Sequence, residues 1–263
     1  MNAPGAAALS RRWTPDRLAA LREQILEQAR IVKGPHRFET DWATTDDGLL
    51  DLRGVKAGRD GLQFRFLTLS RVDFRHARGR LLFFESELSD CLFDSASLTG
   101  QPRFDRSFVR CSFRDATLKG LAIGTRVAEC DFTGADLRSL GSLPNTRFEG
   151  CRFDATDLSG AAFSDTTFTD CTFVDAAFSA DTSFTRCTFV NTSVPFGLAR
   201  VSRSRRDGDP LPDQWDGEDQ ADAAREAYAH RYARAAAAGR AEDLPLDPAA
   251  ATAQALASKI IGE

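Results

Sequence analysis

The chain has 263 residues, of which 42% are hydrophobic and 27% are charged, and its formal net charge at pH 7 is −4. These values are ordinary for a protein of one or two soluble domains. No run of about 18 apolar residues could span a membrane, and residues 1–10 lack the apolar run of a signal peptide. We therefore expect a cytoplasmic protein without a membrane partner.

The first predicted element is a helix at about residues 15–33, within an N-terminal segment at 1–47. Thr14 and Pro15 are favoured residues at a helix N-cap and first turn, and apolar residues then recur at helical spacing. A short helix with one apolar stripe needs a surface to pack against. We expect it to cap the repeat described next, and docking of a partner is the alternative.

From Leu62 to Val194, large apolar residues recur every five positions. In Gly150–Asp175 they do so without a slip, and a small residue stands two positions before each of them. A period of five fits neither an amphipathic helix nor a flat strand. It is typical of a repeat that buries its apolar residues by stacking on its neighbours.

The cysteines show a second, longer period. Five of them are separated by 20, 19, 21 and 20 residues, so four fives make one coil and return the chain to the same side. Cys187, sixteen residues after Cys171, is expected on another side. The predicted structural core columns are Phe93, Phe113, Phe132, Phe153 and Phe173; Leu98, Leu118, Leu137, Leu158 and Phe178; and Cys91, Cys111, Cys130, Cys151 and Cys171.

We interpret the cysteines as buried free thiols. Stacked coils are about 4.8 Å apart, whereas a disulfide prefers about 3.8 Å between Cβ atoms. Their spacing is also unlike the paired CxxC spacing of zinc sites. Structural filling of the core is the expected role.

The repeat resembles the pentapeptide-repeat family, whose loose motif is a small residue, Asp or Asn, Leu or Phe, and two polar residues. ADLRS at Ala135 and TDLSG at Thr156 match it, and CDFTG at Cys130 and CTFVD at Cys171 match with Cys in the small position. The resemblance covers about half the chain. It implies a mainly β fold: a right-handed quadrilateral parallel β-helix of about six to seven coils at residues 48–194, with flanking N- and C-terminal α-helices.

Past Val194 the five-residue pattern stops. Residues 195–217 are rich in Arg, Gly and Pro, which predicts a flexible linker. Residues 218–263 are predicted to be helical, and their apolar face is mostly alanine. Capping of the far end and formation of a homodimer are the two roles left open for this segment.

No catalytic constellation is apparent. His36, His76 and His230 stand in different segments, and the chain lacks the GxSxG, P-loop and GxGxxG motifs. We therefore expect no enzyme activity, no cofactor and no metal, and we look to the surface for function.

Charge is uneven along the repeat. Leu62–Ala128 holds eleven basic and seven acidic residues, a net of +4, whereas Glu129–Val194 holds four basic and ten acidic residues, a net of −6. The ten form the candidate partner-binding acidic face: Glu129, Asp131, Asp136, Glu149, Asp154, Asp157, Asp165, Asp170, Asp175 and Asp181.

The family resemblance implies recognition through the surface, since some bacterial members protect DNA gyrase or topoisomerase IV from inhibitors by resembling an acidic DNA-like rod. We therefore expect a non-catalytic scaffold for protein–protein interaction. Its most specific form is DNA mimicry directed at a type II topoisomerase, which would confer drug tolerance. The alternative is an adaptor or structural scaffold for another cytoplasmic partner, using the terminal helices. Neither hypothesis requires direct binding to nucleic acid.

Overall fold

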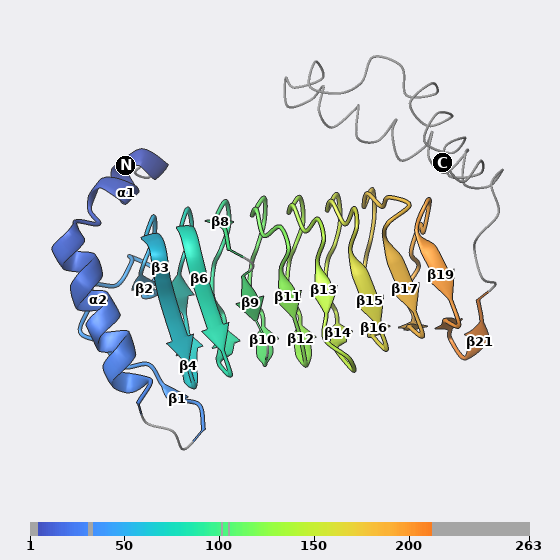
Figure 1. Ribbon diagram of the computed structural model, residues 1–263, viewed down its shortest axis with the longest axis horizontal. Helices are drawn as coiled ribbons and strands as arrows, with labels where there is room; N and C mark the ends of the chain where they lie inside the picture. Colours follow the sequence, from blue (N-terminus) through green and yellow to red (C-terminus); the bar gives the residue numbers. More distant parts are fainter. Residues whose placement is uncertain (1–4, 31–33, 101, 105, 212–263) are drawn as a thin grey trace, which may run out of the picture.

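The computed structural model describes residues 5–30, 34–100, 102–104 and 106–211, except for the side chain of residue 59. The chain forms a parallel β-solenoid of about eight turns, with two helices near its N-terminus (Figure 1). The helices expected within residues 218–263 lie outside the described residues, as does the end of the expected linker.

Two long sheets form two adjacent sides of the rod, the fourth side of each coil leading into the first side of the next. The first side is a ten-stranded sheet, with all pairs parallel except the last; its strands are, in spatial order, β1 (His36–Arg37), β4 (Leu67–Ser70), β7 (Glu87–Ser89), β10 (Ser107–Val109), β12 (Arg126–Ala128), β14 (Arg147–Glu149), β16 (Thr167–Thr169), β18 (Thr188–Val190), β20 (Arg205–Arg206) and β21 (Asp209–Pro210). The fourth side is a nine-stranded sheet with β3 (Lys56–Arg65), β6 (Arg78–Phe84), β8 (Ser97–Leu98), β9 (Arg103–Phe104), β11 (Ala122–Ile123), β13 (Gly141–Ser142), β15 (Ala162–Ser164), β17 (Ser183–Thr185) and β19 (Arg200–Ser202).

The other two sides are narrower. The second side begins with the pair β2 (Leu50–Asp51) and β5 (Val72–Asp73), and single-residue bridges continue it from coil to coil as far as Thr172. The third side begins where the starts of β3 and β6 pair, at Lys56 and Arg78. Next β8 pairs with β6, and bridges continue this side from Ser97 to Ala177. Four sides per coil were expected from four fives per turn.

The interior is built from stacked rings and leucines. On the second side, the ring centroids of Phe93 and Phe113 lie 4.8 Å apart and those of Phe113 and Phe132 lie 4.9 Å apart, with the planes within 9° of parallel. Rings of opposite sides meet edge to face across the interior, as Phe93 and Phe104 do with planes at 90°. Both arrangements are favourable for aromatic pairs. The core therefore runs unbroken along the axis.

The corners between sides require residues in the left-handed backbone region. One such residue turns the corner after the first side in each coil, for example Asp90, Glu129 and Asp170, with φ values of 54°, 53° and 52°. Asp and Asn tolerate this conformation better than most residues. Corner geometry thus accounts for part of the aspartate in the repeat.

Two helices cover the first coil. In α2 (Pro15–Gln28) the Thr14 hydroxyl accepts a hydrogen bond from the Arg17 amide at 3.3 Å. Leu21 and Ile25 are fully buried against the solenoid core. The other helix, α1 (Ala6–Arg11), was not expected from the sequence. Both lie at the blue end of the rod in Figure 1.

The solenoid extends beyond both expected ends. It was expected at residues 48–194 with six to seven coils, but β1 begins at His36 and β20 ends at Arg206. Two insertions, at 38–49 and at 58–61, hide the period of the first coil. In the last coil Val201 stacks on Phe184, and an alanine and a serine occupy other inward positions, so the apolar pattern fades there. Residues 195–211 therefore belong to the last coil of the solenoid, whereas the sequence predicted a flexible linker there.

Candidate binding surfaces

The predicted core columns lie inside the rod and are not available for binding. All fifteen of their side chains are buried, and the five cysteines occupy equivalent positions, two residues before the phenylalanine column. The Cys151 thiol donates to the Val127 carbonyl of the preceding coil at 3.3 Å. Cys187 stacks on Thr166, in a different column, and burial raises the pKa of its thiol to about 12. These buried thiols fill space in the core.

The ten acidic residues do not share one face. Glu129, Asp165, Asp170 and Asp175 sit at three different corners with positive φ. The remaining six are distributed over all four sides or their edges, two on the second side (Asp131, Asp154), two on the third (Asp136, Asp157), one on the first (Glu149) and one before the fourth (Asp181). The set therefore encircles the rod.

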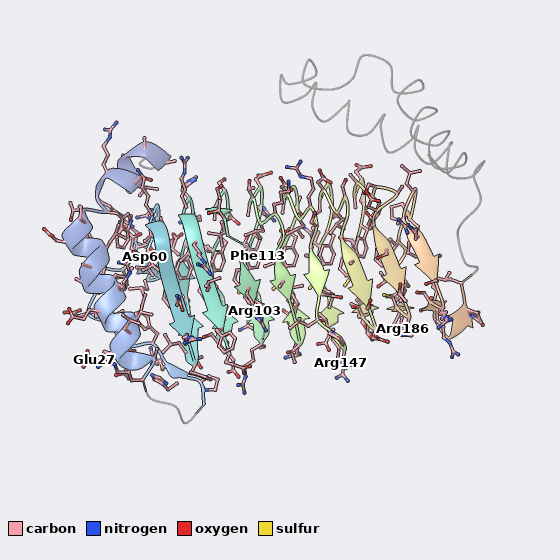
Figure 2. All side chains as sticks on the ribbon, viewed as in Figure 1. Glu27, Asp60, Arg103, Phe113, Arg147 and Arg186 are labelled. Atoms are coloured by element: carbon pink, nitrogen blue, oxygen red, sulfur yellow. The ribbon has the colours of Figure 1, made fainter. Side chains whose placement is uncertain are left out.

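Most of these carboxylates are also paired. Seven of the ten form ion pairs with arginine: Asp131 with Arg114, Asp136 and Asp157 with Arg138, Glu149 with Arg126, Asp154 with Arg152, Asp165 with Arg186, and Asp181 with Arg200. The shortest is 2.5 Å, between Asp136 and Arg138. Arg186 projects outward, as does Arg147, which forms no ion pair with any described residue, whereas Phe113 lies inside (Figure 2). No continuous acidic stripe is formed along 129–194.

At the N-terminal end of the second side, a ladder of alternating charge ties the helical cap to the rod. Arg12 contacts Asp51 at 2.5 Å, Arg53 contacts both Asp51 and Asp73, and Arg75 contacts Asp73 at 2.6 Å. The Asp73 side chain is fully buried and that of Asp51 is 8% exposed. Because every charge in the ladder has a partner, we assign it to the architecture of the cap.

A different surface is formed on the fourth side by apolar residues in outward positions. Phe66, Leu82 and Phe84 are half-buried, and the rings of Phe66 and Phe84 meet edge to edge at 6.3 Å. The guanidinium groups of Arg65 and Arg103 lie over the Phe84 ring, at 5.1 and 5.5 Å from its centroid. We call these five residues the Phe84 patch.

Exposed cations on the third side lie next to this patch. Lys56 and Arg78 are register partners on adjacent coils, and Arg80 and Lys119 lie in a neighbouring column. None of the four forms an ion pair with any carboxylate in the described part of the chain, in contrast to the paired arginines of residues 106–200. We call them the third-side cations. Coils one to four thus present unneutralised positive charge beside aromatic rings.

The sequence reasoning did not identify the Phe84 patch. A signal was present, because Leu81 to Phe84 reads LLFF, and two of these four apolar residues must point outward in a strand. The excess of positive charge in 62–128 is visible in the sequence, but its concentration on two sides depends on which arginines form ion pairs with carboxylates.

In the described part of the chain, no group of three or more His, Cys, Asp or Glu side chains is arranged to hold a metal ion. Neither described helix is long and apolar enough to cross a membrane.

Four-sided coils of five-residue sides define the chain as a β-solenoid repeat protein. Residues 143–188 match the family model described as pentapeptide repeats (9 copies). The resemblance to pentapeptide-repeat proteins that was expected from the motif is therefore confirmed for this part of the chain. No enzyme family is found, and no curated protein matches the sequence.

Solved structures of the same fold class are similar at low sequence identity. Full-length QnrB1, a plasmid-mediated fluoroquinolone resistance protein, is 16% identical, with a TM-score of 0.38 over 66% of this chain and 94% of that chain. HetL, a pentapeptide-repeat protein involved in heterocyst differentiation regulation in the cyanobacterium Nostoc sp. strain PCC 7120, is 11% identical, with a TM-score of 0.28 over 70% of this chain and 92% of that chain.

Proposed function

We propose that this chain is a non-catalytic binding scaffold whose protein interface is the Phe84 patch together with the third-side cations. The observation that carries the proposal is the pair of arginines, Arg65 and Arg103, over a half-buried aromatic ring on a flat sheet. Aromatic residues and arginine are the types enriched at the centres of protein interfaces.

The charge of this surface indicates the kind of partner. The third-side cations have no carboxylate partner among the described residues, so their charge is available to another molecule. A partner with an acidic rim and an apolar centre would complement both features and would associate faster at low ionic strength. We therefore propose an acidic protein partner.

Charge reversal tests the interface. We would use the wild-type chain, an Arg78→Glu, Arg80→Glu double variant, a Phe84→Ser variant and an Arg147→Glu control to capture partners from the native cytoplasm. The interface proposal requires that one stoichiometric partner is retained by wild type and control and lost by both patch variants. Retention by all four proteins would contradict it. If the partner is lost only when residues 218–263 are deleted, the result would support the alternative, in which the chain acts as an adaptor or forms a homodimer through its C-terminal segment.

DNA mimicry directed at a type II topoisomerase is the second candidate. The net charge of −6 over residues 129–194 favours it, but seven of the ten acidic residues are paired with arginine and all ten are spread around the rod. This arrangement lowers the local negative potential that mimicry needs. We expect supercoiling by gyrase, with and without a quinolone, to be unchanged by a large excess of the protein. Protection of gyrase would instead move the interface to the acidic half.

A further inference from the structure

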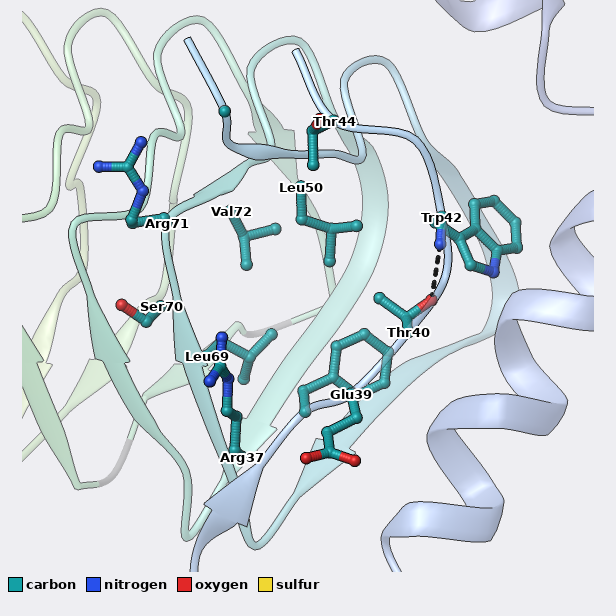
Figure 3. Close-up of a pocket in the computed structure, with 12 residues that line it drawn as sticks. Arg37, Glu39, Thr40, Trp42, Thr44, Leu50, Leu69, Ser70, Arg71 and Val72 are labelled. Atoms are coloured by element: carbon teal, nitrogen blue, oxygen red, sulfur yellow. Dashed lines mark hydrogen bonds between the residues drawn. The ribbon is translucent and has the colours of Figure 1, made fainter.

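An insertion in the first coil leaves a cavity on the outside of the rod. In later coils a single residue, such as Asp90, turns the corner between the first and second sides. In the first coil, residues 38–49 replace that residue and run outward before β2 begins. The result is a cavity of about 460 Å³ between this segment and the coil beneath it (Figure 3). Its volume is in the range of small-ligand pockets.

Four apolar residues lie at the floor of the cavity. Leu50 is half-buried, and Leu69, Val72 and Phe38 are buried residues of the core. Leu69 and Val72 belong to the underlying coil, so they are held by the ladder of the ten-stranded sheet and by the β2–β5 pair. A rigid apolar floor favours a ligand with an apolar body, because its burial removes apolar surface from water.

The polar groups at the cavity are not equally available. The Thr40 hydroxyl already donates to Gln24 and accepts from the Trp42 amide, and Ser70 accepts from Ser89. Arg71 donates to the Asp47 carbonyl at 2.8 Å. The guanidinium of Arg37, by contrast, is exposed and forms no ion pair or hydrogen bond with any described residue.

The charges around the cavity favour an anionic ligand end. Two arginines line it, and Glu39 is the one carboxylate among its twelve lining residues. The Gln28 side chain fixes the backbone of Glu39. Its Oε1 accepts a hydrogen bond from the Glu39 amide at 2.8 Å, and its Nε2 donates to the Glu39 carbonyl at 2.6 Å. In Figure 3 the Arg37 guanidinium points toward the part of the cavity near Leu69, whereas the Glu39 carboxylate points the opposite way. Arginine matches a carboxylate with two parallel hydrogen bonds.

We propose that this cavity binds a small carboxylic acid with an apolar body, with the carboxylate on Arg37 and the body on Leu50, Leu69 and Val72. Such a site is separate from the proposed protein interface, which lies on the third and fourth sides. Loss of one function therefore need not affect the other.

The test uses the full chain with labelled leucine and valine methyl groups, titrated with octanoate, octylammonium and octanol. We expect octanoate to shift the Leu50, Leu69 and Val72 methyl resonances saturably, with Val174 unaffected, and to bind about tenfold more tightly than the other two compounds. Preference for octylammonium or octanol, or no saturable shift, would overturn the proposal.

Variants locate the site. Arg37→Gln should weaken octanoate binding about tenfold. Arg147→Gln is its matched control. Arg37 pairs in register with Thr68, and Arg147 lies in the same outward column of the first side, four coils beyond Thr68. Ser70→Phe should fill the cavity and abolish binding, whereas Thr169→Phe, in the same column as Ser70, should not. Equal affinity of Arg37→Gln and Arg147→Gln, or binding by folded Ser70→Phe, would contradict the assignment.

Discussion

Asp51 and Asp73 are register partners on adjacent coils, and the two buried carboxylates share Arg53 between them. Arg12, which directly follows helix α1, closes the ladder on Asp51 at 2.5 Å. The cap is therefore attached to the rod by charge as well as by Leu21 and Ile25. Removing Arg12 leaves a buried carboxylate with one partner fewer, and we expect Arg12→Ala to lower the free energy of unfolding by about 3 kcal/mol. Urea denaturation measures this, with Arg147→Ala as an exposed control.

The same carboxylate makes stability depend on pH. Burial alone raises the pKa of Asp51, but hydrogen bonds from Arg12 and Arg53 outweigh burial and hold it well below its ordinary value. A folded-state pKa below the unfolded one contributes stability above the unfolded pKa, and that stability is lost as pH falls through the folded pKa. We expect the free energy of unfolding to fall below about pH 4. In Asp51→Asn this part of the decline should be absent; an unchanged profile would contradict the assignment.

Ring stacking predicts the cost of opening the core. Phe132 and Phe153 are fully packed, with centroids 5.1 Å apart and planes 5° from parallel. Phe132→Ala removes one ring from the middle of the column, and we expect a loss of about 3–5 kcal/mol. Val174, which is 62% exposed, provides the control. A loss below about 1 kcal/mol for Phe132→Ala in urea denaturation would mean that the column does not stabilise the rod.

Two glycines should respond in opposite ways to alanine. Gly79 has φ +95°, and the Cβ of an alanine at this position would lie 1.8 Å from the carbonyl oxygen of Ala57 in the preceding coil. Gly141 has no atom within 4 Å of such a Cβ and no positive φ. Gly79→Ala should therefore destabilise by several kcal/mol or prevent folding, whereas Gly141→Ala should be neutral or stabilise by about 0.5 kcal/mol. Melting temperatures of the two variants decide this; a similar effect at both positions would be inconsistent with the structure.

His36 is a candidate for stabilisation by an apolar residue. Both of its ring nitrogens are buried without a hydrogen-bond partner among the described residues, and its register partner in the next coil is Leu67. A buried polar group without a partner costs about 1–3 kcal/mol, and an apolar replacement of similar shape avoids that cost. We expect His36→Leu to raise the melting temperature. A lower melting temperature would indicate that the imidazole has a partner after all.

The cysteines should be protected in the folded protein. All six are free and buried, and burial raises the pKa of Cys187 and Cys91. Because the thiolate is the reactive form, a thiol-specific reagent should react slowly with the native protein and with all six thiols after unfolding. Rapid labelling of one thiol under native conditions would identify an accessible cysteine and contradict the column of filled positions.

The period of five located the columns because each coil places its residues above those of the preceding coil. Phe113, Phe132 and Phe153 could thus be assigned to one column from spacing alone. The first and last coils escaped this reasoning for a physical reason. Insertions at 38–49 and 58–61 shift Phe38 and Phe64 out of step although their backbones still pair with the next coil. In the last coil, the smaller buried residue Val201 takes the place that the Phe184 ring occupies in the preceding coil, so the apolar period is no longer visible in the sequence.

The pairing of charged side chains was harder to predict than the residues of the core. Asp136 and Arg138 are two residues apart and could be paired by inspection, but Arg114 reaches Asp131 and Arg186 reaches Asp165 across coils. Whether such partners meet depends on the corner each residue occupies. A count of charge by sequence segment therefore overestimates the exposed negative charge of 129–194.

Residue order alone was enough to establish the coil, its four sides and the identity of its interior, because stacking along an axis imposes a repeat that is written directly in the chain. The folded arrangement decided which charges are neutralised, which arginines cover Phe84, and where a cavity opens beside Arg37. These features arise from contacts between side chains and insertions of different coils. Such contacts depend on distances in the folded chain, which cannot be read from the order of residues.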